Sequence, residues 1–263
     1  MQHRAKKRLG QNFLVDTNII NKIIRSINPQ AGDQLIEIGP GLGALTQPLL
    51  TKLTRLDVIE LDRDVIPRLK ALEGNDKLYI HNIDVLAFDF TGFRQSNCAN
   101  EKLRIIGNLP YNISTAVLFH LIRHRNVIRD MHFMLQKEVV ERIAADVGSH
   151  DYGRLSVMMQ LHFKISPLFT VSAHCFRPVP KVESAIIRLI PKTSLSIGVD
   201  QYDDFAALVK QAFSQRRKTL KNTLKGLCDT SRIKAAGIDP GKRPQQLTIN
   251  DYINLFRQLN TAA

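Results

Sequence analysis

The sequence predicts an α/β protein with a mostly parallel, doubly wound sheet, followed by a small domain made only of helices. Short apolar segments alternate with stretches long enough for helices, which is typical of parallel strands joined by helical crossovers. A glycine-rich loop follows the first of these segments, and toward the end of the chain apolar residues recur only at helical spacing. We therefore expect an α/β domain over residues 1–195 and a helical domain over residues 196–263.

The first expected element is an amphipathic helix over residues 16–28, with isoleucines at helical spacing and Asp16 as its N-cap. Short apolar segments that predict parallel strands follow at residues 34–39, 55–61, 77–82, 102–108 and 131–136. Two strands of an antiparallel edge and two helices are expected after them, at residues 161–171, 183–191, 202–227 and 250–260.

Composition limits the compartment and the metal chemistry of the protein. The chain has 263 residues, 44% of them hydrophobic, which is enough for a sizeable core. No run reaches the roughly 18 apolar residues of a membrane span, and no apolar segment follows the basic start, so we expect a cytoplasmic protein without a membrane anchor. Cys98, Cys175 and Cys228 lie far apart without a CxxC pair, so neither a disulfide framework nor a bound metal is expected.

The charge balance predicts a polyanionic partner. Lysine and arginine outnumber aspartate and glutamate by 37 to 24, which gives a formal net charge of +13. Basic residues cluster in "HRAKKR" (3–8) and "QRRKTLKNTLKG" (215–226), without a compensating acidic block. A solvated surface is the alternative, and an anionic membrane is disfavoured because neither cluster has a Trp-rich or Phe-rich face. We expect nucleic acid as the partner, bound less tightly as the salt concentration rises.

The glycine-rich loop predicts a nucleotide-like cofactor. Gly39, Gly41 and Gly43 lie between a strand and a helix, where missing side chains let a ligand approach the backbone. Their spacing is G-x-G-x-G, unlike the G-x-G-x-x-G fingerprint of dinucleotide sites. At the end of the next strand, the carboxylate of Glu60 can accept hydrogen bonds from ribose hydroxyls. Asp84 ends the third strand, where it can accept from an adenine amino group.

Each of these features also has a purely structural interpretation. The glycines could form only a turn, Glu60 could pair with Arg63, and Asp84 could cap the next helix. The functional interpretation is favoured because the three features fall in order at the carboxyl ends of consecutive strands. Open parallel sheets bind ligands at that edge.

The fourth strand ends in "GNLPYNIS" (107–114), which predicts chemistry on an adenine amine. This amine is a poor nucleophile, so an enzyme that alkylates it must accept hydrogen bonds from its N–H groups. Asn108 and the carbonyl of Leu109 can accept these bonds. Pro110 would fix the direction of that carbonyl, and Tyr111 can stack on the base. The alternative is an Asx-Pro turn that ends the strand, with Tyr111 in the core.

These motifs resemble those of the small-subunit ribosomal RNA adenine dimethyltransferases, the family behind kasugamycin sensitivity in bacteria. The match covers nearly the whole chain in order. Many methyltransferases share the glycine loop and "NLPY", whereas "GQNFL", "FRPVPKVES" and "FSQRRKTLKN" are far more specific. The matching segments are "GQNFL" (10–14), "EIGPGLGALT" (37–46), "VIELD" (58–62), "NID" (82–84), "GNLPYNIS" (107–114), "FRPVPKVESAIIRL" (176–189) and "QAFSQRRKTLKN" (211–222).

The resemblance implies a class I S-adenosylmethionine-dependent methyltransferase. It implies methylation of two adjacent adenosines, twice each at N6, in a hairpin loop near the 3′ end of small-subunit (16S) rRNA. The substrate would be a pre-30S particle during assembly, and we expect a monomeric enzyme. Cofactor contacts are implied for Asn12, Leu14, Gly39, Gly41, Glu60, Asp84 and Asn108. Asn108 would also touch the target base, with Tyr111 on one face of the base and Phe176 on the other, although Phe176 could instead pack within its own loop.

The basic segment in the predicted helical domain is expected to bind rRNA. On a continuous helix, Arg217, Lys221 and Lys225 would share one face. The residues expected to bind phosphates are Arg216, Arg217, Lys218, Lys221 and Lys225, together with the cluster at 3–8.

Three other functions are weighed against this one. A large-subunit rRNA adenine methyltransferase of the macrolide-resistance type shares the glycine loop and the Asn-x-Pro-aromatic motif, but "FRPVPKVES" and "QRRKTL" favour the small subunit. In a non-catalytic ribosome assembly factor, an intact Asn108, Tyr111 and Glu60 would be unnecessary, although binding and catalysis can coexist. A nicotinamide dehydrogenase is disfavoured by the glycine spacing.

Overall fold

The computed structural model describes residues 11–97, 101–194, 196–198 and 200–260. The chain divides into two compact units, which comprise residues 1–140 with 165–191 and residues 141–164 with 192–263. Residues 141–164, from within the predicted α/β domain, belong to the second unit. The predicted domain boundary after residue 195 stays a prediction.

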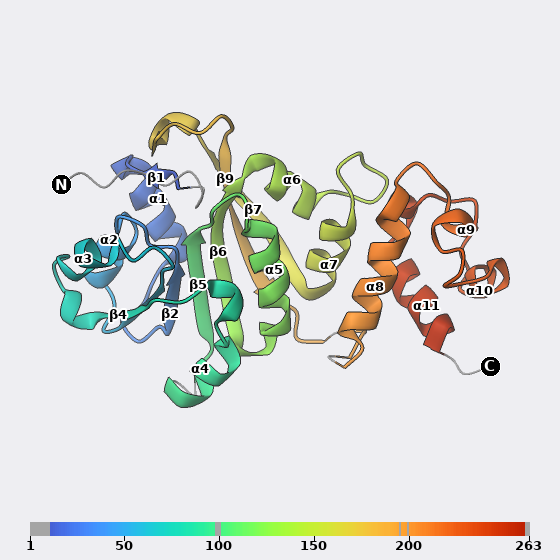
Figure 1. Ribbon diagram of the computed structural model, residues 1–263, viewed down its shortest axis with the longest axis horizontal. Coiled ribbons are helices and arrows are strands. Elements are labelled where there is room, and N and C mark those ends of the chain that lie inside the picture. Colours follow the sequence, from blue (N-terminus) through green and yellow to red (C-terminus); the bar gives the residue numbers. More distant parts are fainter. Residues whose placement is uncertain (1–10, 98–100, 195, 199, 261–263) are drawn as a thin grey trace. The chain divides into compact units, whose positions relative to one another are not determined.

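A mostly parallel sheet, seen in Figure 1, confirms the predicted α/β class. In the described part of the chain it has seven strands in the order β4-β3-β2-β5-β6-β9-β7. Neighbours from β4 to β6 pair in parallel, and β9 runs antiparallel to β6 as predicted. The strands are β2 (Leu35–Ile38), β3 (Leu56–Ile59), β4 (Leu78–His81), β5 (Leu103–Asn108), β6 (Ile128–Gln136), β7 (Phe163–Val171) and β9 (Ser184–Pro191). A separate antiparallel pair joins β1 (Phe13–Leu14) to β8 (Phe176–Arg177).

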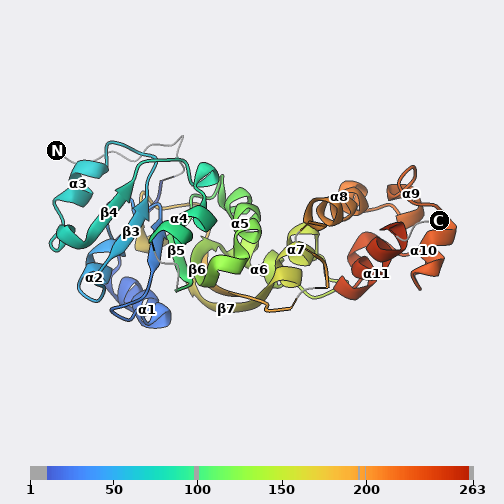
Figure 2. The same cartoon turned by 90° about the horizontal axis from the view of Figure 1, so that it is seen from below.

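Helices cover both faces of the sheet, with α1 and α2 on one face and α4 and α5 on the other (Figure 2). The predicted N-cap of α1 is confirmed, because the carboxylate of Asp16 accepts the Ile19 N–H at 3.0 Å. The helix ends at Asn28, whose backbone is left-handed. The helices before the second unit are α1 (Thr17–Ile27), α2 (Thr46–Leu50), α3 (Ile66–Lys70), α4 (Phe90–Asn97) and α5 (Ser114–Arg123), and α6 (Lys137–Ala144) leads into that unit.

The parallel register brings the carboxyl ends of four strands to one edge of the sheet. Ile38 of β2 is level with Ile59 of β3 and with Gly107 of β5. Ile59 is in turn level with His81 of β4. Beyond the strands the Glu60 N–H still donates to the His81 carbonyl at 3.0 Å. The segments predicted to be functional therefore meet at this edge.

The second unit is helical, but its basic segment is not the long helix that the sequence predicts. Its helices are α7 (Arg154–His162), α8 (Tyr202–Ala212), α9 (Leu220–Thr223), α10 (Thr230–Ala235) and α11 (Ile249–Asn260). The predicted helix over 202–227 is wrong, because α8 ends at Ala212. The N–H groups of Leu220 and Lys221 donate instead to carbonyls of the 240–242 loop, at 2.9 and 3.2 Å. No helix among the described residues is long and apolar enough to cross a membrane.

Candidate functional site

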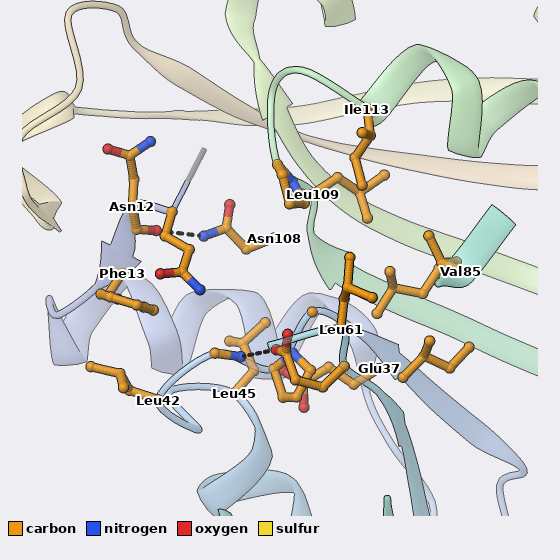
Figure 3. Close-up of a pocket in the computed structure, with 18 of the residues that line it drawn as sticks. Asn12, Phe13, Glu37, Leu42, Leu45, Leu61, Val85, Asn108, Leu109 and Ile113 are labelled. Atoms are coloured by element: carbon orange, nitrogen blue, oxygen red, sulfur yellow. Dashed lines mark hydrogen bonds between the residues drawn. The ribbon is translucent and has the colours of Figure 1, made fainter. Parts of the chain in front are cut away.

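A cavity of about 290 Å³ opens at the carboxyl ends of β2, β3, β4 and β5 (Figure 3). Nearly all residues that the sequence predicts for cofactor and substrate lie in its wall. They are Asn12, Leu14, Gly39, Gly41, Glu60, Asp84, Asn108, Leu109, Pro110 and Tyr111. Their roles toward the cofactor and the target base stay predictions.

The glycine loop has a backbone that side chains would disturb. Gly39 and Gly41 have φ angles of +66° and +54°, in the region that favours glycine. A Cβ atom on Gly41 would lie 3.1 Å from the ring of Phe13, and one on Gly39 would lie 4.0 Å from the Asn108 carbonyl oxygen. The missing side chain of Gly41 therefore lets the loop lie close to Phe13, whereas at Gly39 the positive φ is what favours glycine.

Glu60 ties the end of β3 to the glycine loop. Its carboxylate accepts the Asp62 N–H at 2.7 Å and the Gly41 N–H at 3.3 Å. Burial raises the pKa of this carboxyl above its ordinary value. Arg63, considered as its partner, donates to Asn82 at 3.1 Å. Glu60 therefore faces the cavity with its carboxylate positioned by the backbone.

Asp84 caps a turn, as its structural interpretation predicts, and it also lines the cavity, whereas its contact with an adenine amine stays a prediction. Its carboxylate accepts the Leu86 N–H at 2.9 Å and so caps a short 3₁₀ turn over Val85–Ala87. The residue also lines the cavity, between the apolar side chains of Ile83 and Val85. An acidic side chain with apolar neighbours on both sides suits a flat heterocycle that carries an amino group.

The amide of Asn108 has a fixed orientation. Its Nδ2 donates to the backbone carbonyl of Asn12 at 3.0 Å. Because a carbonyl oxygen only accepts hydrogen bonds, the nitrogen must face Asn12, and Oδ1 points away from it (Figure 3). The acceptor that the predicted chemistry requires is therefore oriented by a contact within the protein.

Tyr111 is held at both ends, by the turn after β5 at its backbone and by Ser184 of β9 at its hydroxyl. The Pro110 carbonyl accepts the N–H groups of Ile113 and Ser114 at 3.2 and 3.0 Å, which leads the chain into α5. At the other end, the Tyr111 hydroxyl lies 2.8 Å from the Oγ of Ser184. Tyr111 is half-buried and lines the cavity, so the alternative that it is a core residue does not apply.

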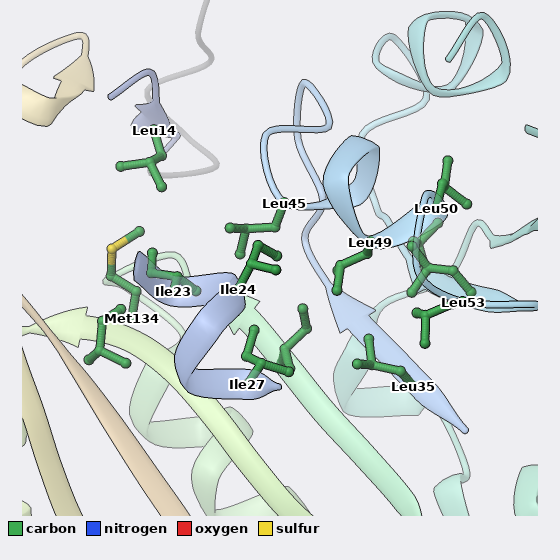
Figure 4. Packing of buried hydrophobic residues seen from close by; sticks show 14 of the residues in the cluster. Leu14, Ile23, Ile24, Ile27, Leu35, Leu45, Leu49, Leu50, Leu53 and Met134 are labelled. Atoms are coloured by element: carbon green, nitrogen blue, oxygen red, sulfur yellow. The ribbon is translucent and has the colours of Figure 1, made fainter. Parts of the chain in front are cut away.

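Phe176 is the predicted site residue that does not line the cavity. It is 1% exposed and belongs to a hydrophobic cluster with Leu14 and Ile23. Figure 4 shows Leu14 and Ile23 in this cluster. Antiparallel pairing of β1 with β8 places Phe176 opposite Leu14. The structure thus supports the packing interpretation of Phe176, and its predicted place over the target base finds no support here.

Glu37 is a cavity residue that sequence reasoning missed. It is 2% exposed, and the hydroxyl of Thr46 donates to its carboxylate at 2.8 Å. Burial raises the pKa of this carboxyl from 4.5 to about 7. Its position in β2, two residues before Gly39, was the available signal. This position lies near the same edge of the sheet as the other acidic residues.

Replacing Glu37 by Gln should make the protein less sensitive to alkaline pH. With a native pKa near 7 and an unfolded value near 4.5, the native state keeps its proton longer than the unfolded state. The free energy of unfolding therefore falls as the pH rises through this interval. The gain from Glu37→Gln should be about 2 to 3 kcal/mol larger at pH 8 than at pH 5.

Urea unfolding of the wild type and the variant at both pH values measures this difference. Glu73→Gln removes an exposed carboxyl and serves as the control. An equal effect of Glu37→Gln at pH 5 and pH 8 would show that the carboxyl is ionised in both states.

The basic residues predicted to bind RNA are exposed in the second unit. Arg217 and Lys218 lie in the turn before α9, Lys221 on α9 and Lys225 just after it. Arg216 differs, because its guanidinium donates to the backbone carbonyl of His150. The other basic cluster, at residues 3–8, lies outside the described residues.

In the described ranges, no group of three or more His, Cys, Asp or Glu side chains gathers in a way that could hold a metal ion. The groups that line the cavity include amides, carbonyls, carboxylates and aromatic rings.

The fold and the position of the cavity define the class of protein. The crystal structure of a dimethyladenosine transferase from Plasmodium falciparum is similar with a TM-score of 0.76 and 28% identity, over 92% of this chain and 95% of that one. The crystal structure of the 23S rRNA methyltransferase ErmE has a TM-score of 0.68 at 24% identity, over 95% of this chain and 100% of that one, and shows the fold alone. The protein is a class I methyltransferase.

Sequence comparisons specify the family. A model of the family described as ribosomal RNA adenine dimethylase matches residues 2–261. Two proteins named Ribosomal RNA small subunit methyltransferase A, from Pseudomonas putida and Neisseria gonorrhoeae, are each 50% identical to this chain. The matches cover 98% of this chain and 96% and 97% of the two relatives. The chain therefore belongs to the ribosomal RNA adenine dimethylase family.

Proposed function

We propose that this enzyme methylates N6 of two adjacent adenosines, twice each, in a hairpin loop near the 3′ end of small-subunit rRNA, during assembly of the 30S particle. S-adenosylmethionine is the proposed methyl donor. The observation that carries the proposal is the amide of Asn108, which is oriented by Asn12 at the same sheet edge as the glycine loop and Glu60. Relatives that share half of the sequence are named for the small subunit.

The residues of the cavity fit this cofactor. Gly39 has no side chain in front of the loop, so the methionine portion can approach the backbone there. The carboxylate of Glu60 can accept from both ribose hydroxyls. Asp84 can accept from the adenine amine while Ile83 and Val85 flank the ring. When bound, S-adenosylmethionine supplies an electrophilic methyl group on a positively charged sulfur.

Residues at the end of β5 bind and orient the target amine. Oδ1 of Asn108 and the carbonyl of Leu109 accept its N–H groups, which aligns the nitrogen lone pair with the methyl group. The Leu109–Pro110 peptide has no N–H group, so it presents only an acceptor. These dipoles also stabilise the positive charge that develops on the nitrogen. Tyr111 offers its ring as a stacking face for a base drawn out of the RNA. The proton can leave to water after attack, so no general base is required.

The second unit is proposed to hold the RNA. Its exposed basic residues Arg217, Lys218, Lys221 and Lys225 can neutralise phosphates around the loop. Arg216 is less available for this role, because its guanidinium donates to the backbone of its own unit. The first unit would then carry out the chemistry while the second positions the substrate.

Transfer of tritiated methyl groups to unmethylated 30S particles, 50S particles and free rRNA tests this proposal. We expect incorporation into small-subunit RNA. Incorporation only into 50S particles would favour the macrolide-resistance type of activity. Binding without incorporation would favour a non-catalytic assembly factor.

As a test of the cofactor, S-adenosylmethionine should protect the protein against thermal unfolding, whereas NAD should not.

A further inference from the structure

Ser184 carries a buried hydroxyl that contacts Tyr111 of the cavity wall, and the proposed chemistry gives it no role. It is 0% exposed and begins β9. Its Oγ lies 2.8 Å from the Tyr111 hydroxyl. The β6–β9 register places it opposite Gln136, two residues beyond Met134, which is level with Asn108 of β5. The sheet therefore places Ser184 at the same edge as Asn108.

The neighbours of Ser184 hold it firmly. The preceding residue, Glu183, accepts the backbone N–H of Lys137 at 3.0 Å, and its carboxylate pairs with the Lys137 ammonium at 2.9 Å. Ser184 itself pairs across the sheet with β6. Because the backbone is held on both sides, the Cα atom of Ser184 keeps its position, and its hydroxyl stays within hydrogen-bond distance of Tyr111.

The backbone of Tyr111 is held independently of Ser184. The Ser114 hydroxyl donates to the Tyr111 carbonyl at 3.2 Å, within the turn that leads into α5. These contacts fix the Cα end of the side chain, whereas the hydroxyl of Ser184 fixes the far end of the ring. Burial raises the pKa of the Tyr111 phenol, so the phenol stays neutral and able to donate.

We propose that Ser184 is a positioning residue that holds the Tyr111 ring in the orientation required for the second methylation of each adenosine. This inference rests on the proposed function. An unmodified adenine amine offers two N–H groups to Asn108 and Leu109, and both contacts orient it. After the first transfer only one N–H group remains, so the orientation of the nitrogen depends more on the stacking face. If the ring were held only at its Cα end, the rate of the second transfer would fall more than the rate of the first.

Single-turnover assays on unmethylated 30S particles, with products separated as mono- and dimethyladenosine, test this inference. The variants are Ser184→Ala, Tyr111→Phe and the double variant. Tyr111→Phe removes the same hydrogen bond by deleting the hydroxyl of its half-buried partner, and it leaves the sequence of β9 unchanged. We expect each single variant to slow the second transfer about tenfold and the first about threefold or less, with unchanged affinity for S-adenosylmethionine.

The double variant and a control distinguish positioning from general destabilisation. If one hydrogen bond is responsible, the double variant should be no slower than the slower single variant. Ser156→Ala removes another fully buried serine hydroxyl, in α7, and should leave the ratio of the two rates unchanged. Equal slowing of both transfers, or multiplied effects in the double variant, would overturn the inference. If the wild type yields no dimethyladenosine at all, the proposed function itself fails.

Discussion

Replacing Asn108 by Ala should slow methyl transfer about 10²- to 10³-fold while leaving rRNA affinity nearly unchanged. The variant loses the oriented acceptor for the target amine, and such preorganised groups contribute effects of this size. Its affinity for RNA should persist because phosphate contacts dominate that affinity and lie on other residues. Single-turnover transfer with saturating enzyme measures the first quantity, and filter binding to unmethylated 30S particles measures the second.

Two companions sharpen this prediction. Asn254→Ala makes the same change at an exposed position of α11 and should have no effect on transfer. Asn108→Asp keeps an acceptor but places a carboxylate against the Asn12 carbonyl, where Nδ2 now donates. It should therefore be slow as well. Wild-type rates in Asn108→Asp would show that the contact with Asn12 does not orient the side chain, and loss of RNA binding in folded Asn108→Ala would contradict its assigned role.

Reversing the charge of Arg217 and Lys221 together should weaken binding to unmethylated 30S particles by at least about 100-fold near 0.1 M salt. Each lost phosphate contact also lowers the dependence of log K on log salt by about 0.7 to 0.9. The slope for the double variant should therefore fall by about 1.4 to 1.8. Binding measured over a series of salt concentrations gives both values.

The matched control is Lys52→Glu with Lys70→Glu, which changes the net charge equally at exposed positions of the first unit. This control should weaken binding much less, because the effect depends on the site of contact rather than on total charge. An unchanged affinity and slope in Arg217→Glu/Lys221→Glu would contradict the role of the second unit in holding RNA. The control matters because the whole chain is basic, with a net charge of +13.

Most of the cavity wall was predictable because its residues follow strands in chain order. Gly39, Glu60, Asp84 and Asn108 each come at or just after the end of an apolar segment, and parallel pairing brings such ends together. The prediction needed only the order of the strands and their direction. It did not need the distances between side chains.

Long-range packing could not be predicted in the same way. The hydrogen bond between Tyr111 and Ser184 joins residues 73 positions apart, and it depends on the antiparallel register of β9. Phe176 lies in a strand of two residues, which is too short for alternation to indicate the buried face. The local pattern favours a continuous helix after Ala212, and it does not indicate that the Leu220 and Lys221 N–H groups donate to carbonyls of the distant 240–242 loop.

The most direct test of the proposed activity is nucleoside mass spectrometry of small-subunit rRNA after reaction with the enzyme and S-adenosylmethionine, with the modified positions mapped. The account predicts N6,N6-dimethyladenosine at two adjacent positions of one hairpin loop near the 3′ end. It also predicts that 50S particles treated in parallel remain unmodified. Only monomethyladenosine, or dimethyladenosine confined to large-subunit RNA, would contradict it.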